Sequence, residues 1–300
     1  MMKLKNAIWS VIALLALGLG SAFAQETDEN GYSFNSIRPI RNADIMFKKT
    51  IWYRLDLKEK QNSPFASKNL ELTKVIIDAV KAGVLRPYKN DSLNARMPLQ
   101  EFLENLKIPG AEETGDDIFG GGGSDDWGGG GGWGDDGGGG WGDDGGGGGA
   151  AEGGKKAEAI VNELFPKEIY QLDIKEDMIF DRKRSRVYHD IQSITLIFPA
   201  ERNPAGYEKQ IATFSYKELV EQVFVDNGSA IWYNNLNPGE HRNFADAFDL
   251  RLFAKRIWKF ANSKDESIED KYGGNPELAL FKGLEYEHKL LDQEAELWSY

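Results

Sequence analysis

The residues best suited to chemistry are the carboxylates of the segment 173–181, DIKEDMIFD. A glycoside hydrolase needs two carboxyl groups, one as general acid and the other as base or nucleophile. Basic residues at 175 and 182–184 are interleaved with the carboxylates, which favours a solvated, ion-paired surface over a catalytic pair. Glycan hydrolysis is therefore kept as an alternative function only. The carboxylates in question are Asp173, Glu176, Asp177 and Asp181.

Other side chains that support catalysis are either missing or isolated. His189, His241 and His288 stand alone, without the spacing of a zinc-binding helix. The chain has no cysteine, which excludes disulfides, thiolate metal ligands and a cysteine nucleophile. No G-x-S-x-G elbow and no phosphate-binding loop is present. We expect no catalytic residues, no cofactor and no metal ion.

Glycine, aspartate and tryptophan dominate residues 115–154, where WGDDGGGG occurs at 133–140 and again at 141–148. Glycine loses more backbone entropy on ordering than other residues do, so we expect a flexible insertion over 111–154. Aspartates among glycines are also typical of calcium-binding nonapeptide repeats, but the apolar position of those repeats is absent here. A calcium-dependent adhesive module is the second alternative function.

Residues 1–24 have the pattern of a secretory signal peptide: Lys3 and Lys5, an apolar run, and the ending Ala22-Phe23-Ala24. Cleavage after Ala24 predicts an exported, soluble chain with a disordered lead-in over 25–36. The formal net charge is −12. Nucleic acid and anionic lipid would repel such a chain, so neither is an expected partner.

Both strands and helices are expected in the rest of the chain. Residues 45–57 are rich in β-branched and aromatic residues and alternate in their last part, which predicts a strand or a short helix running into a strand. Strands are also predicted over 191–198, 210–214 and 230–233. Apolar residues at helical spacing predict helices over 70–82, from 98 onwards with Leu99 and Phe102 buried, and over 216–224, 243–261 and 276–298. Gly83 is placed to end the first of these helices. Without a βαβ rhythm, the fold class is α+β.

Two segments recur at an offset of 117 residues: 53–59 matches 170–176, and 97–106 matches 214–223. This favours a diverged tandem repeat, with chance similarity of charged segments as the alternative. We therefore expect an N-terminal α+β half over 37–110 and a C-terminal half over 155–300 that ends in a long helix. The insertion separates the two halves.

The chain resembles the GldN/PorN family along nearly its whole length after the signal peptide. The resemblance lies in motifs spread from the first strand to the last helix. They are Ile37-Arg38, Asp44-Ile45, Trp52, Leu55–Asn62, Pro64, Ile174–Asp177, Phe180-Asp181, Phe248, Arg251, Phe253, Ile257, Glu285–His288 and Leu297-Trp298. The glycine-rich insertion departs from the family pattern.

The resemblance implies a non-enzymatic subunit of the type IX secretion and gliding machinery, at the periplasmic face of the outer membrane. It implies a ring assembled with an outer-membrane lipoprotein of the GldK/PorK type, and contacts with inner-membrane motor proteins of the GldL/PorL and GldM/PorM types. Large aromatic residues are favoured at interface cores. An ordinary core position is the favoured alternative for each of the candidate contacts, which are Trp52, Tyr53, Trp232, Tyr233, Trp258 and Trp298.

Overall fold

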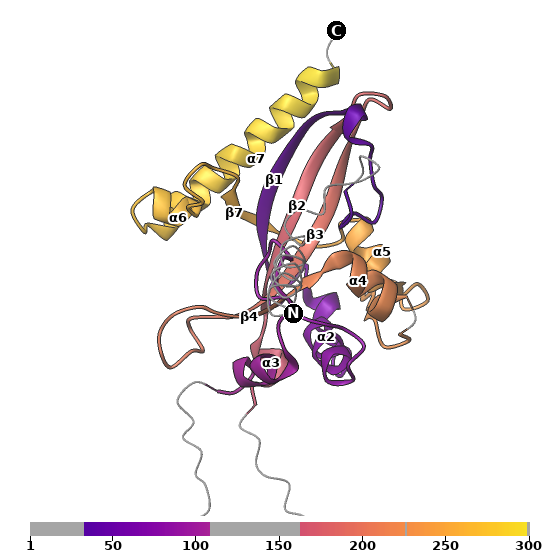
Figure 1. Ribbon diagram of the computed structural model, residues 1–300, viewed down its shortest axis with the longest axis vertical. Helices are drawn as coiled ribbons and strands as arrows, with labels where there is room; N and C mark the ends of the chain where they lie inside the picture. Colours follow the sequence, from indigo (N-terminus) through magenta and orange to yellow (C-terminus); the bar gives the residue numbers. More distant parts are fainter. Residues whose placement is uncertain (1–32, 109–162, 226, 299–300) are drawn as a thin grey trace, which may run out of the picture.

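Five antiparallel strands form the central sheet, in the order β4-β3-β2-β1-β7 (Figure 1). The computed structural model describes residues 33–108, 163–225 and 227–298. Together with the helices, the sheet confirms the α+β class. The strands are β1 (Ile45–Asp56), β2 (Gln171–Asp181), β3 (Arg186–Phe198), β4 (Lys209–Ser215) and β7 (Arg256–Phe260); β5 (Ile231–Trp232) and β6 (Arg242–Asn243) form a separate hairpin.

The two copies of the sequence match lie side by side in this sheet. β1 and β2 are antiparallel, with Tyr53 opposite Ile174 and Leu55 opposite Leu172. These four side chains belong to the buried core. The second pair of matching segments, 97–106 and 214–223, is also in contact, because the rings of Phe102 and Phe214 meet edge to face with their centroids 6.4 Å apart. The tandem repeat and the two-half organisation remain predictions.

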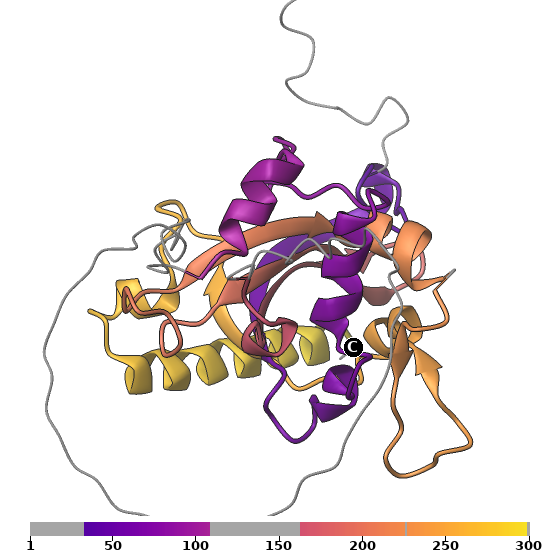
Figure 2. The same cartoon turned by 90° about the horizontal axis from the view of Figure 1, so that it is seen from below.

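Short helices cover the sheet near the β4 side, and a long helix lies near β7 (Figures 1 and 2). α2 buries Val75, Ile76 and Val80, and Gly83 follows its C-cap with a φ of +72°, which suits glycine. α3 buries Phe102, but Leu99 is exposed at its first position, so that part of the prediction was wrong. The helices are α2 (Leu72–Lys81), α3 (Leu99–Asn105), α4 (Tyr216–Leu219), α5 (Phe244–Asp249), α6 (Ile268–Lys271) and α7 (Pro276–Trp298); short turns of helix are η1 (Asn42–Asp44), η2 (Ser63–Ala66), η3 (Pro166–Glu168) and η4 (Val220–Phe224).

The predicted helix over 243–261 is instead a short helix, a turn and a strand. α5 ends at Asp249, and Arg251 adopts a φ of +56°. The Arg251 and Leu252 amides then donate to the carbonyls of Phe248 and Ala247, a Schellman motif with arginine where glycine is usual. The prediction was wrong because the helix-ending residue is not glycine, and because β7 pairs with the edge of β1.

The ends of the glycine-rich segment are held together. Lys107 and Glu163 form an antiparallel bridge, and the Leu164 amide donates to the Leu106 carbonyl at 2.7 Å. Two neighbouring backbone segments are thus joined by residues 108–162. The segment itself lies outside the described residues, and so do the flexibility and calcium binding considered for it.

Deleting residues 115–154 should leave the fold intact, because the remaining chain still spans paired ends. Loop closure depends only weakly on loop length, so shortening the connection should raise the free energy of unfolding by only about 1 kcal/mol. Urea denaturation of the two forms measures this difference. Loss of soluble protein on deletion would contradict the linker interpretation.

α7 packs closely against β7 through a glycine. A Cβ atom on Gly283 would lie 2.8 Å from the carbonyl oxygen of Ile257. Nearby, the rings of Phe260 and Tyr286 stack with centroids 4.4 Å apart, and Lys49 of β1 donates to Gln293. The absence of a side chain at 283 therefore sets the distance between α7 and the sheet.

Gly283→Ala should destabilise the protein by about 1–2 kcal/mol, because the added methyl group overpacks this contact. Helix propensity alone predicts the opposite sign, a gain of about 1 kcal/mol for alanine. Thermal melting followed by circular dichroism distinguishes the two. Gly228→Ala is the matched control, because its Cβ would meet nothing within 4 Å. A higher melting temperature for Gly283→Ala than for wild type would show that the close contact does not destabilise the variant.

Candidate functional site

Charged and aromatic residues occupy the face of β1 and β2 opposite the core. Along β1, Ile51, Tyr53 and Leu55 belong to the core, so Trp52 and Arg54 point the other way. Arg54 lies directly opposite Asp173, and Trp52 lies opposite Lys175. Each of the two cations, Arg54 and Lys175, therefore lies beside a partner on the neighbouring strand.

Arg54 binds two carboxylates at once. Its Nε and one terminal nitrogen donate to Asp173 at 2.9 and 3.1 Å, and its two terminal nitrogens donate to Glu208 at 2.6 and 2.9 Å. Burial raises the pKa of Asp173, and Arg54 opposes that shift. Burial lowers the pKa of Arg54, but Asp173 and Glu208 outweigh it and leave the pKa raised. Arg54 is therefore a fixed cation whose donors are already engaged.

A cleft of about 420 Å³ opens over this pair. The guanidinium of Arg54 lies 5.1 Å from the ring of Trp258, whose buried indole nitrogen has no hydrogen-bond partner. The cleft therefore brings an indole ring together with a cation and its two carboxylate partners. The cleft is lined by Trp52, Arg54, Asn90, Asp91, Ser92, Asp173, Thr195, Ile197, Glu208, Gln210, Trp258 and Lys259.

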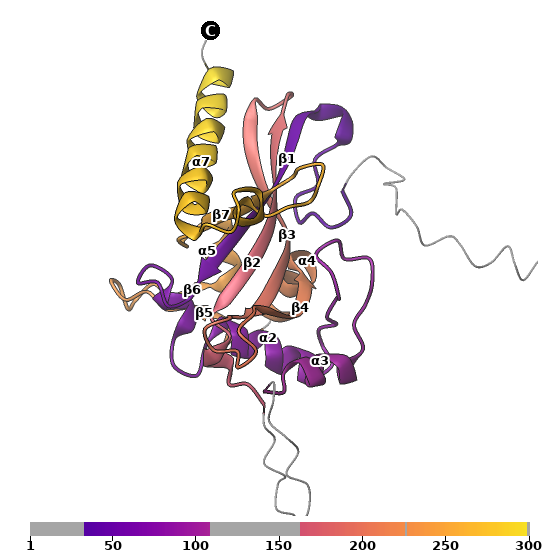
Figure 3. The same cartoon turned by 90° about the vertical axis from the view of Figure 1, so that its left-hand side faces the viewer.

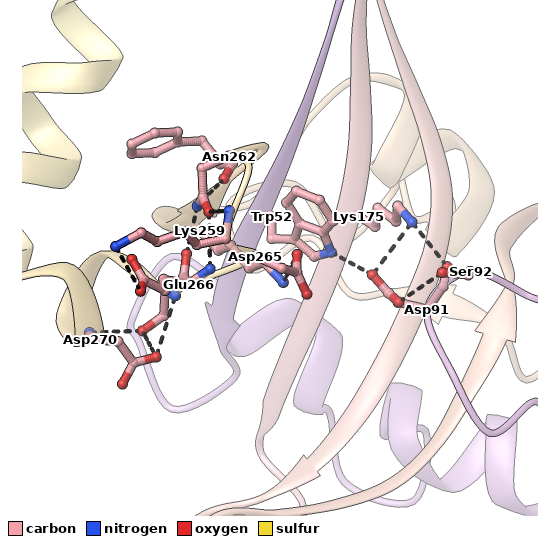
Figure 4. Close-up of polar contacts among 12 residues, drawn as sticks. Trp52, Asp91, Ser92, Lys175, Lys259, Asn262, Asp265, Glu266 and Asp270 are labelled. Carbon is pink, nitrogen blue, oxygen red and sulfur yellow. Dashed lines mark hydrogen bonds and ion pairs between the residues drawn. The ribbon is translucent and has the colours of Figure 1, made fainter.

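The indole of Trp52 is fixed from two sides, as Figure 4 shows. Its nitrogen donates to Asp91 at 2.8 Å, and Lys175 lies 3.4 Å from the same carboxylate. Burial raises the pKa of Asp91, but Lys175 and the indole N–H outweigh it, so the pKa is lowered. Lys259 sits 4.7 Å from the Trp52 ring and pairs with Asp265 at 2.6 Å. Trp52 is only 9% exposed, so this arrangement holds it as part of the wall of the cleft.

The four predicted carboxylates are ion-paired, as expected, but the expectation that they are solvated was wrong, since all four are buried. Asp177 pairs with Lys48 at 2.7 Å, and Asp181 pairs with Arg184 at 2.8 Å. Asp173, Asp177 and Asp181 follow one another at four-residue intervals along β2. Such an interval spans about 13 Å of extended strand, too long for the carboxyl pair of a glycosidase.

Glu176 is the centre of a buried ionic cluster. Its side chain is 0% exposed, and its Oε1 lies 2.6 Å from His189 Nδ1 and 2.8 Å from an Arg251 nitrogen. Lys255 lies 3.3 Å from Oε2 and also 3.2 Å from the centre of the Tyr53 ring. A carboxylate only accepts hydrogen bonds, so His189 carries a proton on Nδ1. The cluster fastens the turn between α5 and β7 to β2.

Asp190 is a half-buried carboxyl group with an unfavourable neighbour. Burial and the charge of Asp177, which lies directly across the strand pair, raise its pKa to about 6. Gln192 donates to Asp190 at 2.7 Å and partly offsets this. Asp190 lines a second, smaller cavity of about 160 Å³, beside Tyr216, whose buried hydroxyl has no partner.

Asp190→Asn should stabilise the protein by about 1–3 kcal/mol at neutral pH. The folded state binds more protons than the unfolded state between the usual pKa of 3.8 and the raised value of about 6. Wild-type stability should therefore fall as pH rises through that window, whereas the variant should lack this fall and match wild type near pH 3. Urea denaturation at a series of pH values tests this. A constant difference across the series would contradict it.

The six candidate contact residues are not all brought together. Trp52 and Trp258 share the large cleft, whereas Tyr53 faces the core. Trp232 is half-buried on the β5–β6 hairpin, where Tyr233 stacks on His241 at 4.5 Å. The side chain of Trp298 lies outside the described part of the chain. Their role as partner contacts remains a proposal.

Sequence reasoning missed several residues of the cleft. Arg54 was not singled out, although it alternates with the core residues Tyr53 and Leu55 along β1 and lies opposite Asp173. Asp91 and Glu208 lie in loops far from both strands in sequence, and no local pattern indicates them.

Neither a metal site nor a membrane span is present in the structure as described. Within 33–108, 163–225 and 227–298, no three histidine or carboxylate side chains gather so as to hold a metal ion. No helix in those ranges is both long and apolar enough to cross a bilayer.

Comparison with known families identifies the chain. The model of the family described as "Gliding motility associated protein GldN" matches residues 40–299, which include every helix and strand described above. The chain belongs to the GldN family. The GldN family is a component of the gliding motility and type IX secretion machinery. Among curated proteins, none matches this sequence.

Proposed function

We propose that this GldN-family chain is a non-enzymatic scaffold subunit of the type IX secretion and gliding machinery. In this proposal it acts in the periplasm, on the inner face of the outer membrane, after removal of residues 1–24. It self-associates and assembles with an outer-membrane lipoprotein of the GldK/PorK type into a large ring. It also contacts inner-membrane motor proteins of the GldL/PorL and GldM/PorM types.

The observation that carries the proposal is the family match over the whole described fold. The state of the carboxylates supports the non-enzymatic part, because the four on β2 are each held by a cation. A general acid or nucleophile needs a carboxyl group free to meet substrate. These groups fasten strands and turns instead.

The cleft around Trp258 is the proposed contact for a partner protein. Tryptophan and arginine dominate the energetics of many interfaces, and here Trp52, Trp258 and Arg54 line the same cleft. Trp258 is only half-buried, so its ring can contact a partner protein, although its N–H is enclosed. Trp52 is less suited, because its own nitrogen is already bound to Asp91.

A binding measurement between the purified chain and the soluble part of a GldK-type lipoprotein tests this proposal. Trp258→Ala should weaken binding by about tenfold or more if the indole is an interface anchor. Phe165→Ala, which removes another exposed ring, is the matched control and should leave affinity unchanged. An equal loss of affinity in both variants would show that the cleft is not part of the interface. If the wild-type chain does not bind the lipoprotein, the proposed partnership is contradicted.

A further inference from the structure

The last helix, α7, has one face against the sheet and one face that no other described element covers (Figure 3). Gly283 contacts the backbone of Ile257, Tyr286 stacks on Phe260, and Leu290 is buried. These residues are spaced three and four apart, so they define the inward face. The outward face is made of the residues between them.

Apolar residues recur on the outward face with the spacing of a helix-packing seam. Phe281, Leu284, Leu291 and Ala295 are all exposed, and His288 completes the alternating steps of three and four residues. Leu280 adjoins the same stripe and is exposed as well. Isolated exposed leucines are common, but a stripe of this length in a soluble surface is typical of an interaction site. At 1.5 Å per residue, the 23-residue helix is about 35 Å long, enough for several turns of a partner helix.

Acidic residues border the stripe on both sides. Glu287 and Glu294 lie on one side, and Glu285 and Asp292 lie on the other, at the positions that flank the apolar seam of paired helices. Glu285 is already neutralised by Lys282 and Lys289, at 2.6 and 2.7 Å. The remaining three flanking carboxylates give the surface a negative border.

We propose that the outward face of α7 binds an amphipathic helix of another protein, whose apolar seam is flanked by lysine or arginine. Leucine and phenylalanine side chains would supply the buried seam, and the carboxylate border would pair with the basic flanks. This inference rests on the helix itself and does not depend on the proposed scaffold function.

Charge selects this occupant over three others. In a parallel pair of two α7 helices, Glu287 of one copy would face Asp292 of the other, and like charges at these positions repel. The aspartates of residues 115–154 carry the same sign as the border, which disfavours that segment of the chain. Anionic lipid is repelled for the same reason.

The test uses the full purified chain and two synthetic three-heptad peptides with leucine at the seam positions. One peptide carries lysine at the flanking positions and the other carries glutamate. Fluorescence anisotropy should show binding of the lysine peptide, weakened by added salt, and little binding of the glutamate peptide. The double variant Leu284→Ser with Leu291→Ser should bind the lysine peptide at least about tenfold more weakly than wild type does. A double change Leu236→Ser with Leu250→Ser removes two exposed leucines elsewhere and should leave binding unchanged.

The double variant Glu287→Lys with Glu294→Lys tests the acidic border separately, because it leaves the apolar seam intact. This variant should lose its preference for the lysine peptide. Equal binding of both peptides by wild type, or equal loss in both leucine double variants, would overturn the proposal. So would wild-type dimerisation or vesicle binding that the Leu284/Leu291 variant abolishes, since either assigns the seam to another occupant.

Discussion

Glu176→Leu should lower the free energy of unfolding by about 2–4 kcal/mol, because it leaves the charges of Arg251 and Lys255 without their buried partner. The two cations are 30% and 14% exposed, so solvent relieves part of the cost, and we expect less than the full penalty of a broken buried pair. The effect is large because Glu176 joins β2 to the turn that leads into β7. Chemical denaturation followed by tryptophan fluorescence measures it.

A double-mutant cycle separates the ion pair from the cavity. Glu176→Leu combined with Arg251→Leu should cost less than the sum of the single changes, because the second change removes the stranded charge. Glu104→Leu, at an exposed glutamate of α3, is the control and should change stability by less than about 0.5 kcal/mol. Strict additivity in the cycle would show that Glu176 and Arg251 do not interact.

Phe248→Ala should be the most damaging single change in the core, with a loss of about 3–5 kcal/mol. Phe248 is 1% exposed, and its ring lies among four others. The distances between ring centroids are 5.2 Å to Phe65, 5.8 Å to Tyr216, 6.4 Å to Phe224 and 5.5 Å to Phe253. Truncation would leave a cavity that short helices on either side cannot easily close.

Phe281→Ala is the control for this prediction, because it removes the same ring from an exposed position of α7. Its effect on the free energy of unfolding should stay within about 0.5 kcal/mol. Urea denaturation of both variants gives the comparison. A loss below about 1 kcal/mol for Phe248→Ala would mean that the aromatic cluster repacks around the missing ring.

Much of the secondary structure could be predicted from local sequence. The alternation in 45–57, the apolar stripe in 70–82 and the long pattern in 276–298 correspond to β1, α2 and α7. The region 243–261 could not, since its apolar residues fit a helical period while the chain turns at Arg251. Beyond the turn β7 pairs with β1, and Arg251 pairs with Glu176, 75 residues away in sequence, so the contacts that fix this region are distant ones.

The candidate site shows the same division between local and distant information. Trp52 and Trp258 stand out as large aromatic residues, but they share a cleft only because β7 pairs with β1. The carboxylates of β2 are ion-paired, as predicted, but only Asp181 pairs with one of the interleaved basic residues, Arg184. Burial was not predictable, because three of the four are paired with basic residues on other elements, such as Lys48 and Arg54 of β1 and Arg251 near α5.

The scaffold proposal is tested most directly by the size and content of the native complex. The measurement is gentle detergent extraction of the cell envelope, purification through a tagged copy of the chain, and sizing with mass spectrometry of the material that co-purifies. We predict a particle of megadalton size that contains an outer-membrane lipoprotein of the GldK/PorK type. A monomer recovered alone from the periplasmic fraction would contradict the proposal.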